Sequence, residues 1–301
     1  MLLQFFKHAN GKLILLILLF VLIIRTGLAY FHNLDFVSVG IAYLLHGISA
    51  IFINRISTKN LITKKYSFLP AFIFLLLTSS LPFMVYDNVT LAFCLFCLAL
   101  VGLSNIYSSE HINEKLFNAG LIISFAIFIN PILILCIAPF IFIFQIIYNV
   151  SQIKNTLVSL TALLTPIIIL SSIQYIIIGN HSLSNPLFTA FIPTFKLINS
   201  NFITLGFPMV LTLVSLSDLR LNYQHKKILS RKFILLIAIL GIMHLIIFFV
   251  TPIPITSAIF ILLPLTILLA NYFEHIKTKW IHHLMFLLMI IFSITIPFLL
   301  T

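Results

Sequence analysis

The chain contains only six acidic residues, so those that lie apart from the lysines are candidates for chemistry. Asp35 and Asp87 are two such residues, and Arg25 lies in an apolar segment shortly before Asp35. An ionisable side chain inside a bilayer costs about 2.5–3.5 kcal/mol on insertion scales, so it is retained mainly where it is paired or functional. We therefore consider an Arg25–Asp35 or Arg25–Asp87 pair. The alternative is that Arg25 snorkels to the headgroups while both aspartates cap turns.

Histidine and cysteine patterns do not indicate a metal site. His282 and His283 are adjacent and His275 precedes them, but the H-x-x-x-H and spaced H-x-x-H-H motifs of membrane di-iron oxygenases are missing. Cys94 and Cys97 form a C-x-x-C pair within an apolar segment, where small apolar filler is the better interpretation. The sequence therefore predicts no metal and no cofactor.

The amino-acid composition indicates that these residues belong to a membrane protein. Hydrophobic residues make up 61% of the chain, charged residues only 8%, and the mean hydropathy is +1.22. A soluble domain has roughly 25% charged residues, so this chain cannot cover a water-facing surface. We predict an all-α, polytopic transmembrane helical bundle that forms a single domain over residues 1–301.

The apolar runs predict about eleven spans, each near the length that a bilayer requires. Two histidines within these spans, His46 and His244, are expected to hydrogen-bond to a neighbouring helix. In chain order the predicted spans are Leu13–Tyr30, Val37–Asn54, Phe68–Tyr86, Val89–Tyr107, Leu116–Ile129, Pro131–Tyr148, Thr156–Ile178, Phe202–Leu216, Phe233–Val250, Ile255–Tyr272 and His283–Leu300.

The lysines and arginines orient these spans. With the amino terminus inside and the carboxyl terminus outside, every Lys and Arg except Arg25 and Lys196 falls on the inner side, as the positive-inside rule requires. Short basic inner loops are expected at residues 54–66 and 218–232, and the longest outer loop at 179–201. This distribution is typical of a multi-pass protein of the bacterial inner membrane.

The stretch from Glu110 to Asn149 is predicted to form a tight helical hairpin. Its apolar run is interrupted once, at Asn130-Pro131. Proline cannot continue a helix interior and pushes the preceding residue towards an extended conformation, so we place the tip of the hairpin there.

The net charge of +11 has two interpretations. Nucleic-acid binding needs a clustered basic face, whereas here the charge lies in short loops, so no nucleic acid is expected. Topogenic lysines beside anionic lipid headgroups explain it better. The basic loop at 218–232 could also dock a cytosolic or membrane protein partner.

Two resemblances add to these inferences. The anchors Leu116-Phe117-Asn118-Ala119-Gly120, Pro131, Leu164-Thr165-Pro166 and Ala270-Asn271-Tyr272-Phe273 resemble those of a Bacteroidota family of polytopic inner-membrane proteins, which implies a location and a fold but no activity. Asp35 and Asp87, in the first and second outer loops, resemble the acidic residues of GT-C-type glycosyltransferases that act on lipid-linked sugars. The first outer loop is much shorter here than in that class.

The GT-C resemblance implies roles for particular residues. Asp35 would be the general base on an acceptor hydroxyl, with Asp87 beside it as a second catalytic carboxylate. Arg25 and Lys196 would hold the diphosphate of a polyprenyl-phosphate sugar, with His32 at the rim of the same site. Two other functions stay open: a non-enzymatic subunit or scaffold of a cell-envelope assembly, and, as the least favoured, a transporter.

Overall fold

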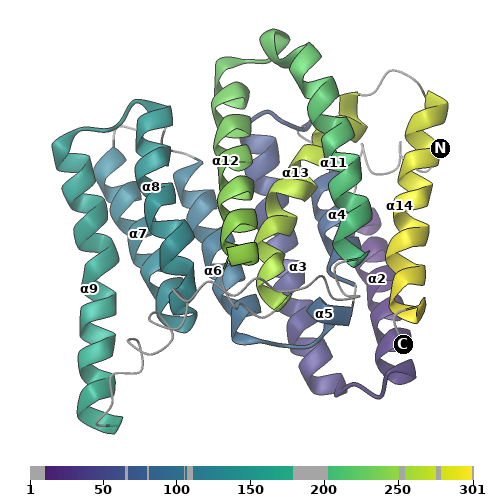
Figure 1. Cartoon of the computed structure of the whole chain (residues 1–301), viewed down its shortest axis with the longest axis horizontal. Coiled ribbons are helices and arrows are strands. Elements are labelled where there is room, and N and C mark those ends of the chain that lie inside the picture. The colour runs from purple at the N-terminus through teal and green to yellow at the C-terminus, as the bar shows by residue number, and fades with distance from the viewer. Residues whose placement is uncertain are drawn as a thin grey trace.

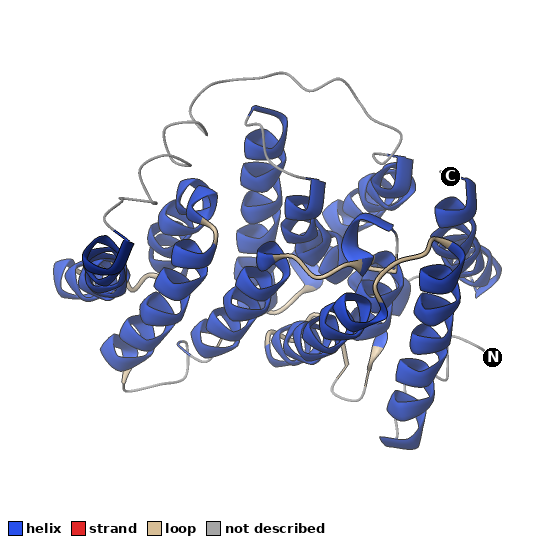
Figure 2. Ribbon diagram, turned by 90° about the horizontal axis from the view of Figure 1, so that it is seen from below, coloured by secondary structure: helices blue, strands red, loops and turns tan. Residues whose placement is uncertain are grey.

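The computed structural model of the chain describes residues 11–64, 67–79, 81–104, 106, 111–178, 203–250, 255–275 and 279–299 (Figure 1). Within these ranges the chain forms helices joined by turns, and no strand occurs (Figure 2). In a bilayer every backbone polar group must find a partner within the chain, and a helix provides one for each interior residue. The predicted all-α class is confirmed.

The described elements follow one another along the chain in a fixed order. They are α2 (Gly11–Phe31), α3 (Phe36–Lys59), α4 (Leu69–Leu77), α5 (Leu81–Met84), α6 (Asn88–Leu103), α7 (Ile112–Ile129), the 3-10 turn η2 (Pro131–Leu133), α8 (Ile134–Tyr148), α9 (Ile153–Ile178), α11 (Ile203–Asn222), η4 (Tyr223–His225), α12 (Ile228–Val250), η5 (Ile255–Ala258), α13 (Ile259–His275) and α14 (Lys279–Leu299).

Each predicted span contains a described helix, but the helices differ in length. Five of those described are long and apolar enough to cross a membrane: Phe36–Lys59, Ile112–Ile129, Ile153–Ile173, Ile228–Phe248 and Thr256–His275. Others, such as Asn88–Leu103, are apolar but shorter. The protein is therefore a helical bundle fit for a membrane, while the number of full crossings remains a prediction.

The connections that carry basic residues lie at one end of the bundle. Figure 1 shows the α8–α9 and α11–α12 connections at its upper end and the α2–α3 connection at the opposite end. Lys154 follows the first of these, and Lys226 and Lys227 belong to the second. This arrangement agrees with the predicted sidedness, in which the upper end faces the cytoplasm.

Helix α13 lies at the centre of the molecule. Of the residues in its span, 94% are buried, and it packs against α4, α11 and α12. Phe260 on this helix contacts the rings of Phe93 and Phe96 on α6, with centroids 5.2 and 5.8 Å apart, and stacks on His244 of α12 at 5.2 Å. The core is thus built from aromatic rings that interlock between helices.

The predicted helix break at Asn130-Pro131 is confirmed, although α7 packs mainly against α9 and α6 and only weakly against α8. Helix α7 ends at Ile129, Asn130 is extended with φ −133° and ψ 91°, and η2 follows before α8. Asn130 N–H donates to Ala126 O and closes α7, and Leu133 N–H donates to Asn130 O in the turn that follows.

The predicted span Phe68–Tyr86 is not one continuous helix, because the helix breaks inside the protein. Helix α4 ends at Leu77 and the separate short helix α5 begins at Leu81, with Thr78 and Ser79 buried between them. Pro82 has no backbone N–H, so the carbonyl of Thr78, four residues earlier, has no intrahelical partner. The break is encoded by this proline together with the preceding hydroxyl residues.

The inner connections are shorter than the predicted loops. Helix α3 continues to Lys59, so the loop expected at 54–66 begins only at Asn60. Likewise, α11 continues to Asn222 and α12 begins at Ile228, which leaves little of the loop expected at 218–232. Long basic side chains can extend a helix past the apolar region, because their charged ends reach water. The loop expected at 179–201 lies outside the described residues.

Candidate functional site

Arg25 is fully buried, with none of its surface exposed, and its guanidinium joins three helices. Its Nη2 donates to the carbonyl oxygen of Thr78 at 2.7 Å and to the hydroxyl of the same residue at 2.8 Å, where α4 ends. Its Nη1 lies 3.0 Å from Nδ1 of His46 on α3. Arg25 therefore neither snorkels to the headgroups nor pairs with a described carboxylate.

The end of α4 explains why a cation lies there. The hydroxyl of Thr78 donates to Phe74 O at 3.0 Å, and the hydroxyl of Ser79 donates to Leu75 O at 2.8 Å. The Thr78 carbonyl, deprived of a partner by Pro82, accepts from Arg25. A helix C-terminus carries a partial negative charge, which a guanidinium complements. Arg25 thus acts as a side-chain cap for a helix that ends inside the bundle.

His46 completes this cluster in one tautomer. Arginine can only donate, so Nδ1 of His46 accepts and the proton lies on Nε2. The His46 ring also meets Phe74 edge-on, with centroids 6.0 Å apart. Nε2 of His46 and Nε of Arg25 are buried without a hydrogen-bond partner. The prediction that His46 bonds to a neighbouring helix is confirmed. For His244 it is wrong, because Nδ1 of His244 lies 2.9 Å from Leu240 O of its own helix.

Tyr43 separates Arg25 from the surface of the bundle. Its ring lies 5.5 Å from the Arg25 guanidinium carbon, and its hydroxyl donates to Leu18 O at 2.6 Å. On the outer side of Tyr43 is an apolar groove of about 360 Å³ between α2 and α3. The groove is lined by Leu18, Leu19, Leu22, Tyr43, Leu44, Gly47, Ile48 and Ile51.

Asp35, the predicted general base, is the N-cap of α3. Its Oδ1 accepts from Val37 N–H at 3.3 Å, and its Oδ2 accepts from Ser38 N–H at 3.1 Å. Asp35 is exposed, and so are the neighbouring side chains of Phe36 and Val37. Both carboxylate oxygens therefore satisfy helix N–H groups, as an N-cap residue does.

Asp87 connects two elements that are distant in sequence. It precedes α6, and its Oδ2 accepts from the hydroxyl of Thr256 in η5 at 2.7 Å. His32 is half-buried, and its ring meets that of Phe31 edge-on at 5.8 Å. Lys196 lies outside the described residues. Of the predicted site residues, Asp35 and Asp87 thus have hydrogen bonds that join or cap helices.

The partners of Arg25 were not predicted from the sequence. Thr78 and His46 lie in different predicted spans, and each is a common residue at an apolar helix contact. One signal was present: Thr78-Ser79 followed by Pro82 marks a helix end within an apolar run. A helix end buried among apolar helices requires a donor, and Arg25 was the conspicuous candidate.

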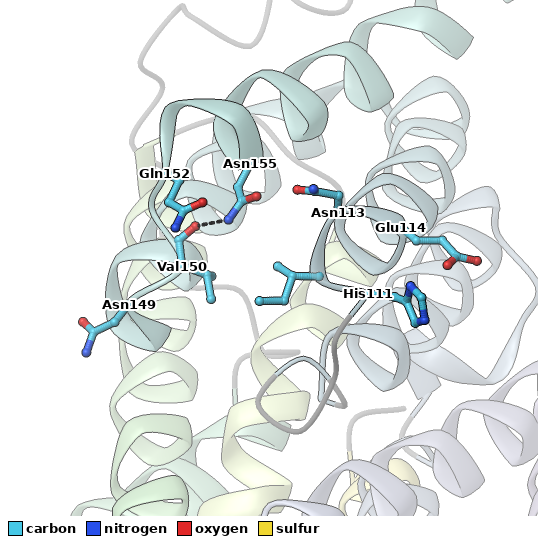
Figure 3. Close-up of a pocket in the computed structure, with 8 residues that line it drawn as sticks. His111, Asn113, Glu114, Asn149, Val150, Gln152 and Asn155 are labelled. Atoms are coloured by element: carbon cyan, nitrogen blue, oxygen red, sulfur yellow. Dashed lines mark hydrogen bonds between the residues drawn. The ribbon is translucent and has the colours of Figure 1, made fainter.

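A second site, at the opposite end of the bundle, was not predicted. A pocket of about 390 Å³ lies between the start of α7 and the α8–α9 connection (Figure 3). Its described lining is His111, Ile112, Asn113, Glu114, Asn149, Val150, Gln152 and Asn155, which include four carboxamides and, within the described residues, no lysine or arginine. The pocket belongs to the end of the molecule that is predicted to face the cytoplasm.

Local contacts shape this pocket. Asn149 ends α8 in the left-handed conformation, with φ 58° and ψ 37°, which turns the chain sharply towards α9. The Asn155 amide donates to Val150 O at 2.7 Å and fixes one wall. Figure 3 shows the carboxamides of Asn113 and Asn155 facing each other, while Glu114 and His111 lie on the other side of Asn113.

Buried hydrogen bonds hold the helices around the pocket in place. Gln145 on α8 donates to the Ser159 hydroxyl at 2.6 Å and accepts from the Thr156 hydroxyl at 3.1 Å, which joins α8 to α9. The Ser124 hydroxyl on α7 donates to Leu163 O on α9 at 2.7 Å. The walls of the pocket therefore belong to one interlocked group of helices.

Comparison of the chain with protein-family models, with curated proteins and with solved structures gave no match. In the described part of the chain, no three His, Cys, Asp or Glu side chains gather closely enough to hold a metal ion. The candidate sites are therefore defined by their geometry: a buried arginine that caps a helix, and a polar pocket at the opposite end.

Proposed function

We propose that the protein is a non-catalytic, multi-pass subunit of a membrane assembly, located in the bacterial inner membrane. The observation that carries this proposal is the position of Asp35. Its two oxygens cap α3 through hydrogen bonds of 3.3 and 3.1 Å, and it is exposed between apolar side chains that are also exposed. Such an environment is typical of a residue that stabilises a short turn between two helices.

A GT-C-like glycosyltransferase would require different surroundings. Its general base must reach an acceptor hydroxyl, and its cations must reach a diphosphate. Here Asp35 lines neither of the two cavities described above, and the guanidinium of Arg25 is directed into the bundle towards Thr78 and His46. These observations favour the subunit over the enzyme.

A transporter is also less well supported. Transporters often break helices around a midplane site, where the exposed backbone binds the substrate. The break between α4 and α5 has this form, but its freed Thr78 carbonyl is already bonded to Arg25. The chain itself occupies the place that a substrate would need.

The α11–α12 connection is the proposed surface for a protein partner. Lys226 in this connection donates to Asn271 Oδ1 at 2.7 Å, and Lys232 in the following helix α12 lies over the Tyr148 ring at 5.9 Å. Gln224 and Lys227 are exposed beside them. The internal contacts hold the turn in one shape and leave its tip available to a cytosolic partner.

Substitution of Asp35 tests this function. Asn and Ser cap helices about as well as Asp, whereas Ala costs about 1 kcal/mol. A structural Asp35 predicts that Asp35→Asn and Asp35→Ser keep both thermal stability in detergent and complementation of a deletion strain, while Asp35→Ala is moderately destabilised. A general base predicts that all three variants fold but fail to complement. Loss of complementation in a fully stable Asp35→Asn variant would refute the subunit proposal.

Cysteine accessibility tests the proposed location and orientation. A cysteine at exposed Ser151 or Gln224 is expected to react with a membrane-impermeant maleimide only after the inner membrane is opened, because the basic ends face the cytoplasm. A cysteine at exposed Asn33, in the α2–α3 turn, should react in cells whose inner membrane is intact. Labelling of Ser151→Cys and Asn33→Cys from the same side would disprove the sidedness.

A further inference from the structure

The apolar groove between α2 and α3 is open space on the surface of the bundle. Its described lining carries no charged side chain, and Leu19, Leu44 and Ile51 in its walls are each at least half exposed. Gly47 also lines it, and a Cβ atom added there would meet no described atom within 4 Å. The described helices therefore leave the groove unfilled, and in a bilayer an apolar chain must occupy it.

The size of the groove fits one hydrocarbon chain. The groove follows α3 from Tyr43 to Ile51, a rise of about 12 Å along the helix axis. Its volume of about 360 Å³ then corresponds to a mean cross-section of about 30 Å². A helix with its side chains is about 10–12 Å across, or roughly 80–110 Å² in section. A helix of another chain could insert only single side chains, whereas an acyl chain fits along the whole groove.

A cationic side chain lies at one end of the groove. Ile48, Ile51 and Arg55 are spaced by three and four residues, so they share one face of α3. Arg55 follows Ile51 by about 6 Å along the axis, and helical side chains lean towards the helix N-terminus, which directs Arg55 back towards the groove. Arg55 is exposed, and in the described part of the chain its guanidinium forms no hydrogen bond or ion pair.

A second cation reinforces the positive charge at this end of α3. Lys59 lies one turn beyond Arg55, within electrostatic range of Arg55 and of Lys115 on α7. The C-terminus of a helix carries a partial charge of about −0.5, which opposes an anion. The full charges of Arg55 and Lys59 outweigh this partial charge. The end of the groove therefore favours the phosphate of an anionic headgroup.

We propose that the groove between α2 and α3 holds one acyl chain of an anionic phospholipid, whose phosphate binds to Arg55. The planar guanidinium of arginine matches the geometry of phosphate oxygens. A zwitterionic headgroup carries its own cation beside the phosphate, which Arg55 and Lys59 repel, so an anionic headgroup is preferred. The site requires only that the protein lies in a bilayer. It therefore goes beyond the proposed function and holds for a subunit or an enzyme alike.

Native mass spectrometry of the full-length protein tests the proposal. Delipidated protein in detergent is titrated with phosphatidylglycerol or with phosphatidylcholine of the same acyl chains. We expect the first phosphatidylglycerol to bind about fivefold more tightly or better, because each cation near the membrane surface favours an anionic lipid. Equal affinity for the two lipids, or no bound lipid, would overturn the proposal. A protein dimer that Gly47→Leu abolishes would also overturn it, because a second copy would then occupy the groove.

Two substitutions separate the acyl chain from the headgroup. Gly47→Leu fills the groove and is expected to weaken binding of both lipids, whereas Gly27→Leu, at an exposed glycine of α2 with equally open space, should leave binding unchanged. Arg55→Gln should remove the preference for phosphatidylglycerol, whereas Lys227→Gln, at an exposed lysine of the α11–α12 connection, should keep it. If one variant does not fold, the other still tests the site. Unchanged binding in folded Gly47→Leu, or an unchanged preference in folded Arg55→Gln, would overturn the proposal.

Discussion

The Arg25 cluster and the polar pocket differ in whether the chain supplies hydrogen-bond partners for buried acceptor oxygens. At the end of α4, the Thr78 carbonyl that Pro82 leaves without a partner is bonded by Arg25, at 2.7 Å. In the pocket, Asn113 Oδ1 is buried without a hydrogen-bond partner among the described residues. The first region lies among apolar helices, where no outside partner is at hand, so the chain must satisfy itself. The second lies at an end of the bundle, between helices whose lining side chains there are mostly polar.

This difference in hydrogen bonding predicts that the two regions contribute differently to the stability of the protein. A residue that satisfies a buried helix end is needed for folding, whatever the protein does. A pocket whose walls are held by other hydrogen bonds, such as Gln145 to Ser159 at 2.6 Å, depends less on its lining side chains. We therefore expect substitutions near Arg25 to lower stability more than substitutions at the pocket lining do.

The largest expected effect is that of Arg25→Met. It leaves the Thr78 carbonyl without its donor in the interior, at a cost of about 3 kcal/mol in unfolding free energy. Pro82→Ala supplies an N–H that can reach this carbonyl, so the double variant should be less destabilised than the sum of the single changes. Equilibrium unfolding in detergent of the four proteins measures this coupling. An Arg25→Met protein as stable as the wild type would show that the cap is dispensable.

An intermediate effect is expected where α7 crosses α9. A Cβ atom added at Gly120 would lie 2.7 Å from Cβ of Ala162, closer than two carbon atoms can pack. Gly120→Ala should therefore destabilise the protein by about 1–3 kcal/mol, the typical cost of overpacking. Ala162→Gly opens the space again, so the double variant should recover most of the stability. Additive losses in the two variants, measured by thermal unfolding, would contradict this contact.

The smallest expected effect on stability is that of Gln152→Leu at the pocket. The side chain is exposed, so the change in unfolding free energy should be within about 0.5 kcal/mol. A loss as large as that of Arg25→Met would show that the pocket lining also supports the fold, and the contrast between the two regions would fail. Melting curves of both variants in the same detergent make the comparison direct.

Much of the architecture could be predicted from the sequence. The helix break at Asn130-Pro131 followed from the local chemistry of proline, and the helical class followed from an apolar composition. The break between α4 and α5 also follows from a proline, Pro82. It was not predicted, because the apolar residues on both sides of this proline form a run long enough to be interpreted as one span. The helices also extend further at the inner end than their apolar runs suggested, because lysines and arginines can continue a helix into water.

By itself, the sequence determined that this chain forms helices suited to a membrane, because its composition allows no water-facing surface and because a helix satisfies its own backbone. Only the tertiary structure decided which polar groups meet. Arg25 bonds to His46 and Thr78, from two other helices, whereas Asp35 bonds to its own helix. Asn113 on α7 and Asn155 on α9 likewise line the same pocket. Contacts between helices depend on their rotation and depth in the bundle, which packing sets and local sequence does not encode.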